Sequence, residues 1–270
     1  MSFEQRQPPH NTAAGTPKAE RRRLLRAWFR TRPGSWVLEE EVAALGQVLP
    51  DLFGYHLLQV ESLDGVDLLK DSRVLNTMVM GAGSRPLHLR HSFFRGVPAV
   101  LPVATDSIDV VVLPHVLEFE DHPHQALREA ERVLVPEGHL VVTGFNPWSL
   151  MGLRRLLDSR RRVVPWSGDF ISTSRLKDWL ALLDFDVIVT DSCFYRPPLH
   201  HPGLMERLRF LDGMGRRLWG MGGGIYVMVA RKRVVALTPL KPRWRAGRRL
   251  LPTGWAEPTT RHAAAEVHGG

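Results

Sequence analysis

The sequence predicts an α/β protein built on a seven-stranded, mostly parallel sheet with flanking helices. From Tyr55 onward, short apolar runs alternate with helix-period segments, which is typical of strands joined by crossover helices. Residues 110–113 form a continuous apolar run that suits a strand buried on both faces. The last two apolar runs have no helical unit of the earlier kind between them. We therefore expect these two strands to pair antiparallel at the sheet edge.

The expected elements follow from the same patterns in chain order. A helix with apolar residues at three- and four-residue steps, and with Glu41 among them, is expected before Pro50. The seven strands are expected at 55–61, 73–80, 97–102, 107–116, 139–145, 185–195 and 224–233. Two further helices are expected at 121–134, where Asp121 can cap, and at 172–183. Five of the strands are expected to be joined by helical crossovers.

Length and charge define the expected domain organisation. A chain of 270 residues with 44% hydrophobic content suits one main domain, which we place at 35–233. Lys and Arg outnumber Asp and Glu by 8 to 2 in residues 1–34 and by 9 to 2 in residues 231–270, whereas residues 35–230 hold 19 against 24. The segments 1–34 and 234–270 are therefore expected to be disordered basic ends.

The sequence favours a cytoplasmic protein with no membrane partner. The single cysteine, Cys193, excludes an internal disulfide and is interpreted as a packed residue. Residues 1–20 are polar, and no run reaches the roughly 18 uninterrupted apolar residues of a membrane span.

One long stretch carries a family resemblance. Residues 101–155 read LPVATDSIDVVVLPHVLEFEDHPHQALREAERVLVPEGHLVVTGFNPWSLMGLRR. Within them "LPVATDSID" and "RVLVPEGH" resemble the second half of the type 11 domain of class I S-adenosylmethionine-dependent methyltransferases. The resemblance extends over roughly residues 35–235, to a bacterial branch of that family. It implies a Rossmann-like methyltransferase fold, S-adenosylmethionine as cofactor and an unidentified methyl acceptor.

The resemblance also implies a cofactor site, and the chain departs from the family pattern there. The turn after the first strand is "ESLDGVD" rather than a glycine-rich loop, the second strand ends at Gly81 without a carboxylate, and Val97 stands where the family has Asp. Glu61 could still meet a cationic ammonium group, although Ser62 and Asp64 can equally cap a short helix. The positions that the resemblance assigns to the cofactor are Glu61, Ser62, Asp64, Gly65, Gly81, Val97, Leu101, Pro102, Leu113, Pro114 and His115.

His115 and Glu118, just beyond the fourth strand, are the candidate catalytic residues. A histidine titrates near neutrality, so His115 could act as a general base, although a satisfied structural histidine fits equally well. The "NPW" at 146–148 is interpreted as a turn at the rim of the pocket rather than an acceptor-binding motif. The histidine pairs lack a metal-site spacing, so no metal is expected.

Three functional hypotheses remain open at this point. The first is a methyltransferase acting on a small-molecule acceptor. The second is a non-catalytic methyltransferase-like binding or scaffold protein, favoured by the loss of the glycines and both carboxylates. The third adds weak nucleic-acid binding through the basic ends, with Trp28, Trp244 and Trp255 available for stacking on bases.

Overall fold

The computed structural model describes residues 18–63, 66–82, 90–157, 168–197 and 202–234. The chain divides into two units, Met1–Val234 and Val235–Gly270, and all of the described residues belong to the first. The expected disorder of residues 1–17 and 235–270 therefore concerns residues outside the described ones.

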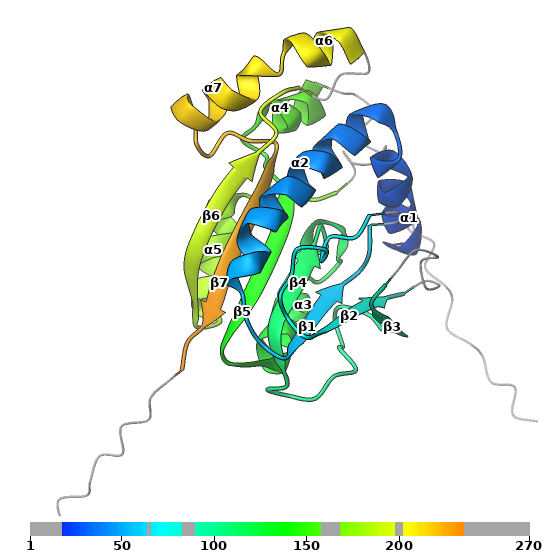
Figure 1. The fold of residues 1–270 in the computed structure, drawn as a ribbon, viewed down its shortest axis with the longest axis vertical. Coiled ribbons are helices and arrows are strands. Elements are labelled where there is room, and N and C mark those ends of the chain that lie inside the picture. The colour runs from blue at the N-terminus through cyan, green and yellow to red at the C-terminus, as the bar shows by residue number, and fades with distance from the viewer. Residues whose placement is uncertain (1–17, 64–65, 83–89, 158–167, 198–201, 235–270) are drawn as a thin grey trace, which may run out of the picture. The chain divides into compact units, whose positions relative to one another are not determined.

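A seven-stranded sheet forms the centre of the fold (Figure 1). The strands are β1 (His56–Val60), β2 (Asn76–Gly81), β3 (Ser92–Arg95), β4 (Ile108–Pro114), β5 (Leu134–Phe145), β6 (Phe185–Cys193) and β7 (Ile225–Lys232). Their order is β3-β2-β1-β4-β5-β7-β6. All neighbours pair parallel except β7, which is antiparallel to both β5 and β6. The predicted fold class is confirmed, and so is the antiparallel β6–β7 pair at one edge of the sheet, in which β6 is the outermost strand.

The third strand was predicted in the wrong place. The structure forms β3 at Ser92–Arg95, and residues 97–102 contribute only an isolated bridge between Val97 and Val100. The proline at 98 and the proline at 102 leave this segment without two backbone donors, so it cannot extend the ladder.

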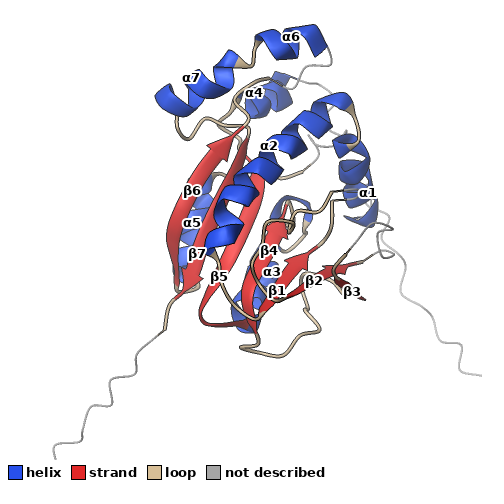
Figure 2. Cartoon of the chain, in the orientation of Figure 1, coloured by secondary structure: helices blue, strands red, loops and turns tan. Residues whose placement is uncertain are grey.

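Helices pack on both faces of the sheet (Figure 2). On one face, α3 (Pro123–Val133) and α5 (Thr173–Leu182) bury Leu127 and Leu180 completely against the sheet. On the other face, α2 (Arg32–Val48) packs Leu45 into a second apolar cluster. A short 3-10 turn, η1 (Leu49–Asp51), follows α2, and η2 (Leu117–Phe119) follows β4.

Helical crossovers are missing where the sequence analysis expected them in the β1–β2 half. Residues 61–63 and 66–75, which lie between β1 and β2, contain turns and no helix. The expectation of helical crossovers therefore fails between β1 and β2.

The N-terminal segment is the second large correction. Residues 18–34, which were expected to be disordered, form α1 (Lys18–Phe29) and the start of α2. Leu25 and Phe29, one helical turn apart, are 3% exposed and anchor α1 in the core on the α2 face. Gly34 permits the tight contact between the two helices, since a Cβ there would lie 2.1 Å from the carbonyl oxygen of Trp28.

The C-terminal part of the fold ends in an edge strand and a group of short helices. β6 forms one edge of the sheet and contains a bulge between Val187 and Val189. The helices α4 (Leu150–Leu157), α6 (Pro202–Arg207) and α7 (Phe210–Leu218) lie together beyond the upper ends of β5 and β6 (Figure 1). Among the described residues, no helix is both long and apolar enough to cross a membrane.

Candidate functional site

Two residues in left-handed backbone conformations follow β1 and β4. Glu61 has φ 66° and His115 has φ 48°, a conformation that few non-glycine residues adopt. Because β1 and β4 are neighbours and parallel, both residues lie at the carboxyl edge of the sheet, where ligands bind in open α/β folds. Such backbone strain gathers at functional sites and is held in place by the surrounding structure.

Helix α1 covers this edge through a set of ion pairs. The Arg22 guanidinium binds the carboxylates of both Glu61 and Glu120, and its side chain is only 9% exposed. Arg26 lies 4.0 Å from the same Glu61 carboxylate, and Lys18 pairs with Glu120. The cationic face of α1 thus already occupies the carboxylate to which the sequence analysis assigned a ligand ammonium group.

Little space remains between α1 and the sheet. The cavity there measures about 20 Å³ and is lined by Arg22, Leu25, Arg26, Glu61, Ser62, Leu63, Pro114 and His115. Small-molecule sites usually occupy about 300–1,000 Å³. The structure therefore places Glu61, Ser62, Pro114 and His115 together, but in a closed cleft.

Behind the cleft, His115 forms a wholly buried cluster with two carboxylates. Its Nδ1 lies 2.9 Å from Glu118 Oε2, and its Nε2 lies 3.2 Å from Glu41 Oε2 on α2. Thr143 donates its hydroxyl to Glu41 at 2.5 Å, and the backbone N–H of Phe145 donates to Glu118. Each polar atom of the histidine ring thus has a carboxylate partner, as buried charged groups require.

The cluster sets the protonation state of His115. Burial alone would lower its pKa, but the charges of Glu41 and Glu118 and their hydrogen bonds raise the pKa of His115 to about 10. The ring is therefore an imidazolium at neutral pH, with both nitrogens donating to carboxylates. A group in this state does not accept a proton from a substrate, so the geometry favours the structural interpretation of His115 over the general base.

Glu118 has the same structural character. It is 1% exposed, and its two oxygens are taken by His115 and by the Phe145 backbone.

The remaining predicted positions are spread over other surroundings. Gly81 ends β2 beside Glu61, since a Cβ at Gly81 would lie 3.7 Å from Glu61 Oε2. Val97 is 47% exposed in the turn after β3. Leu101 and Leu113 pack into the apolar cluster on the α3 face, and Pro102 is exposed near Gly96. Asp64 and Gly65 lie outside the described residues.

Several residues of the site were missed by the sequence analysis. Arg22, Arg26 and Lys18 were taken as part of a disordered basic end, although Leu25 and Phe29 show a helical spacing beside them. Glu41 was noted on an apolar helix stripe, and a lone carboxylate there is the signal of a buried ionic partner.

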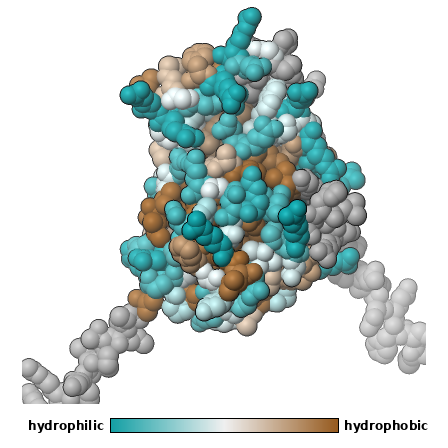
Figure 3. Space-filling model, in the orientation of Figure 1, coloured by the Kyte–Doolittle hydropathy of each residue, from teal (hydrophilic) through white to brown (hydrophobic). Residues whose placement is uncertain are grey.

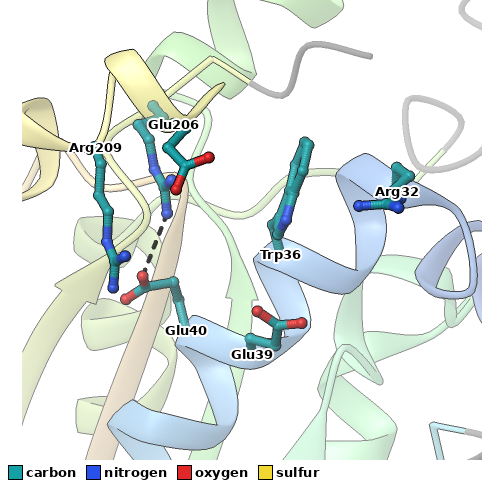
Figure 4. Close-up of a pocket in the computed structure, with 7 residues that line it drawn as sticks. Arg32, Trp36, Glu39, Glu40, Glu206 and Arg209 are labelled. Atoms are coloured by element: carbon teal, nitrogen blue, oxygen red, sulfur yellow. Dashed lines mark hydrogen bonds and ion pairs between the residues drawn. The ribbon is translucent and has the colours of Figure 1, made fainter. Parts of the chain in front are cut away.

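Two larger cavities lie against the outer side of α2. A polar cavity of about 260 Å³ combines acidic and basic side chains with one indole, from Arg32, Trp36, Glu39, Glu40, Arg196, Glu206 and Arg209 (Figure 4). Arg196 spans it, with its Nη2 3.3 Å from Glu40 Oε1. A more apolar cavity of about 490 Å³ lies between α1, α2 and residues 66–70, where the surface is largely brown in Figure 3.

Comparisons with known proteins found a family model and a curated relative that match the chain. The Methyltransferase domain of type 11 matches residues 62–142. The uncharacterized protein YafS of Escherichia coli K12 is 34% identical over 192 residues, which cover 70% of this chain and 74% of YafS.

The chain belongs to the type 11 domain family of class I S-adenosylmethionine-dependent methyltransferases. The family assigns S-adenosylmethionine as the cofactor.

Solved structures of this methyltransferase fold resemble the chain at low identity. A methyltransferase of Thermotoga maritima, a possible histamine N-methyltransferase, matches with a TM-score of 0.54 and 18% identity over 80% of this chain and 95% of its own. The [4+2]-cyclase SpnF matches with a TM-score of 0.51 and 17% identity over 72% of this chain and 80% of its own. At these identities the likeness shows the fold alone, and SpnF illustrates that a fold does not fix a reaction.

With α1 in place, the residues at the carboxyl edge do not fit the cofactor of this methyltransferase family. The 20 Å³ cavity is far smaller than a ligand site, and Glu61 is already bound to Arg22. No helix begins among residues 61–63 and 66–75, so these residues provide no helix N-terminus for an amino-acid carboxylate.

Two further expectations can be compared with the structure. Among the described residues, no group of three or more His, Cys, Asp and Glu side chains is arranged to hold a metal ion. Trp28, which was expected to be available for stacking on bases, is partly buried and packs edge-on against Phe29 and Phe145, at centroid distances of 5.1 and 6.0 Å. Trp244 and Trp255 lie outside the described residues.

Proposed function

We propose that this chain is an S-adenosylmethionine-dependent methyltransferase acting on a small-molecule acceptor, and that α1 closes its cofactor cleft in this structure. The observation that carries the proposal is the position of Glu61. Its carboxylate lies at the carboxyl end of β1, in a left-handed backbone conformation, and is held by the Arg22 guanidinium. A carboxylate bound by a cation of the chain itself can exchange that partner for the ammonium group of a ligand.

The larger apolar cavity supports a closed rather than an absent site. Phe29 lines that cavity, and its ring lies 5.4 Å from the His115 ring, which borders the small cavity beside Glu61. Phe29, the last residue of α1, thus lies between the 490 Å³ cavity and the His115 ring at the carboxyl edge of the sheet. Displacement of α1 would join the two spaces into a cleft within the usual size range of ligand sites.

The alternative function is a methyltransferase-like binding or scaffold protein without turnover. It is favoured by the same closed cleft, because a permanent contact between α1 and Glu61 would exclude the cofactor. The two functions differ in one measurable property, namely whether release of α1 allows S-adenosylmethionine to bind.

Calorimetric titration of the full chain with S-adenosylmethionine and with S-adenosylhomocysteine tests the proposal. We expect Arg22→Ala to bind both ligands at least about tenfold more tightly than the wild type, because less free energy is spent on displacing α1. Glu61→Gln should lose binding. Arg23→Ala is the matched control, since Arg23 lies on the same helix with its side chain 72% exposed and pairs with Glu20.

Each result has a defined meaning. Tighter binding by Arg22→Ala, with Arg23→Ala equal to the wild type, supports a closed enzyme and justifies a search for the acceptor. Absence of heat and of a thermal shift in the wild type and in Arg22→Ala would remove the enzyme proposal and leave the scaffold protein.

A further inference from the structure

Helix α7 presents its apolar residues to solvent. Phe210, Met214 and Leu218 follow one another at four-residue steps and are 61%, 45% and 78% exposed. No residue of α7 is buried. Solvent-exposed apolar residues are common singly, but a stripe of three along one helix indicates an interaction surface.

The opposite side of α7 holds the helix on the protein with small and polar groups. A Cβ at Gly215 would lie 2.5 Å from the Tyr195 ring, so the glycine allows the helix to lie close to Tyr195. Asp212 accepts the backbone N–H of Tyr195 at 2.8 Å and pairs with Arg196. The helix is therefore fixed by Gly215 and Asp212, and its apolar stripe faces outward, the reverse of the usual orientation of an amphipathic helix.

Neighbouring loops extend the apolar stripe. Trp219 and Met221 follow α7 and are 53% and 42% exposed, and Trp148 is 74% exposed. Asn146 joins the two loops, because its side-chain amide donates to the carbonyl oxygens of Met221 and Gly223 at 2.7 and 3.0 Å. We call the set Trp148, Phe210, Met214, Leu218, Trp219 and Met221 the cap surface.

Arg216 and Arg217 lie on α7 itself, beside the cap surface, and the segment around them is rich in arginine. Residues 202–221 contain Arg207, Arg209, Arg216 and Arg217 against Glu206 and Asp212, and Asp212 is engaged with Arg196. The domain around this segment is acidic, with 19 Lys and Arg against 24 Asp and Glu in residues 35–230. This segment therefore carries a net positive charge within an acidic domain, and that charge complements a negatively charged partner.

We propose that the cap surface binds an anionic lipid bilayer, with α7 lying in the plane of the membrane interface. A short helix with Phe, Met and Leu on its outer face, with Arg beside them and Trp219 directly after it, has the composition of an interfacial helix. Trp side chains favour the level of the lipid headgroups, and each Arg near an anionic leaflet adds attraction. With nine residues, α7 lies on a bilayer and does not span it.

The position of the cap surface gives this binding a geometric consequence. Asn146 follows β5 directly and Gly223 precedes β7, so the cap surface belongs to the carboxyl edge of the sheet. A chain bound through it would direct that edge toward the lipid. Binding through the cap surface does not require that the chain transfers methyl groups.

Co-sedimentation of the full chain with vesicles tests the proposal. We expect binding to phosphatidylcholine vesicles that contain phosphatidylglycerol, and weaker binding to phosphatidylcholine alone. Leu218→Glu should lower the partition coefficient roughly tenfold or more, since it replaces an apolar side chain that enters the interface by a charged one. The double variant Arg216→Glu/Arg217→Glu should lower it by at least as much on anionic vesicles, and should change it little on neutral ones.

Leu182→Glu provides a matched control. Leu182 is 81% exposed and is the last residue of α5, as Leu218 is the last residue of α7. The control should bind like the wild type, and the circular dichroism and Tm of all variants should show that they remain folded.

Three outcomes would overturn the proposal. One is a wild type that does not sediment with anionic vesicles. Another is equal binding by the wild type, Leu218→Glu and the double Arg variant, which would assign any lipid binding to other parts of the chain. The third is a wild type that is dimeric by light scattering and becomes monomeric in Leu218→Glu without vesicle binding, in which case a second copy covers the cap surface.

Discussion

The two halves of the sheet are covered differently. In the scaffold half, which contains β4 to β7, α3 and α5 cover one face with fully buried leucines. In the half that contains β1, β2 and β3, the residues described between β1 and β2 form no helix. The carboxyl edge of this second half is covered instead by α1, which comes from the N-terminal segment and is held by Leu25, Phe29 and ion pairs to Glu61 and Glu120. The α3 and α5 cover is apolar, whereas the α1 cover combines apolar anchors with buried ion pairs, whose charges lose their hydration when the helix docks. The sheet is thus covered by crossover helices around β4 to β7, and by a helix from the N-terminal segment where the family fold would hold its cofactor.

The largest expected loss of stability is in the cluster of His115, Glu41 and Glu118, which follows β4. His115→Gln leaves the buried carboxylates of Glu41 and Glu118 without a cation, which should cost about 3–5 kcal/mol of unfolding free energy. Urea denaturation measures this loss. His56→Gln, at an exposed position of β1, is the control and should stay within about 0.5 kcal/mol of the wild type.

A second pair of variants compares how much α3 and α1 contribute to global stability. Leu127→Ala on α3 removes a fully buried side chain and should lower global stability by about 2–5 kcal/mol. Leu25→Ala on α1, at 3% exposure, should mainly speed hydrogen exchange within α1, because that helix can open locally. Equal global losses in the two variants would show that α1 is as integral to the fold as α3.

The pH dependence of stability tests whether His115 is protonated in the folded protein. The pKa of His115 is raised from 6.5 to about 10, so its stabilising contribution is complete below pH 6.5 and is lost as the pH rises through 10. We expect the difference in Tm between the wild type and His115→Gln to shrink steadily between pH 7 and pH 10. A difference that stays constant over this range would contradict a protonated His115 in the folded state.

The smallest expected loss of stability is at the N-cap of α5, in the scaffold half of the sheet. Ser172 accepts the backbone N–H of Arg175 at 3.3 Å, and its replacement by Ala should cost about 0.5–2 kcal/mol. Ser172→Asp, which keeps an acceptor at the N-cap, should retain the wild-type Tm in thermal denaturation.

The scaffold half of the sheet could be predicted from the sequence because the patterns that define its strands and helices lie within short stretches of the chain. The continuous run at 110–113 and the apolar spacing of residues 126–134 define a buried strand and a helix by themselves. The free Cys193 is buried, and burial raises its pKa, in agreement with its interpretation as a packed residue.

The candidate site could be predicted only in part, because its decisive contacts join distant segments. Glu61 was placed correctly at the end of β1, but its partner Arg22 lies 39 residues earlier in a stretch that charge alone marks as a solvated end. The contact between Glu41 and His115 spans 74 residues, and nothing in the spacing of these two residues indicates it. The position of β3 was mistaken because the apolar composition of 97–102 was given more weight than its two prolines.

The bulge in β6 affects the tendency of the protein to aggregate at high concentration. β6 is a nine-residue strand at the open side of the sheet, with Ile188 and Val189 52% and 37% exposed, and a flat apolar strand in such a place would add strands from other molecules. The register shift between Val187 and Val189 interrupts the regular row of backbone donors and acceptors and twists it away. The bulge thus disfavours edge-to-edge pairing of β6 with strands of other molecules.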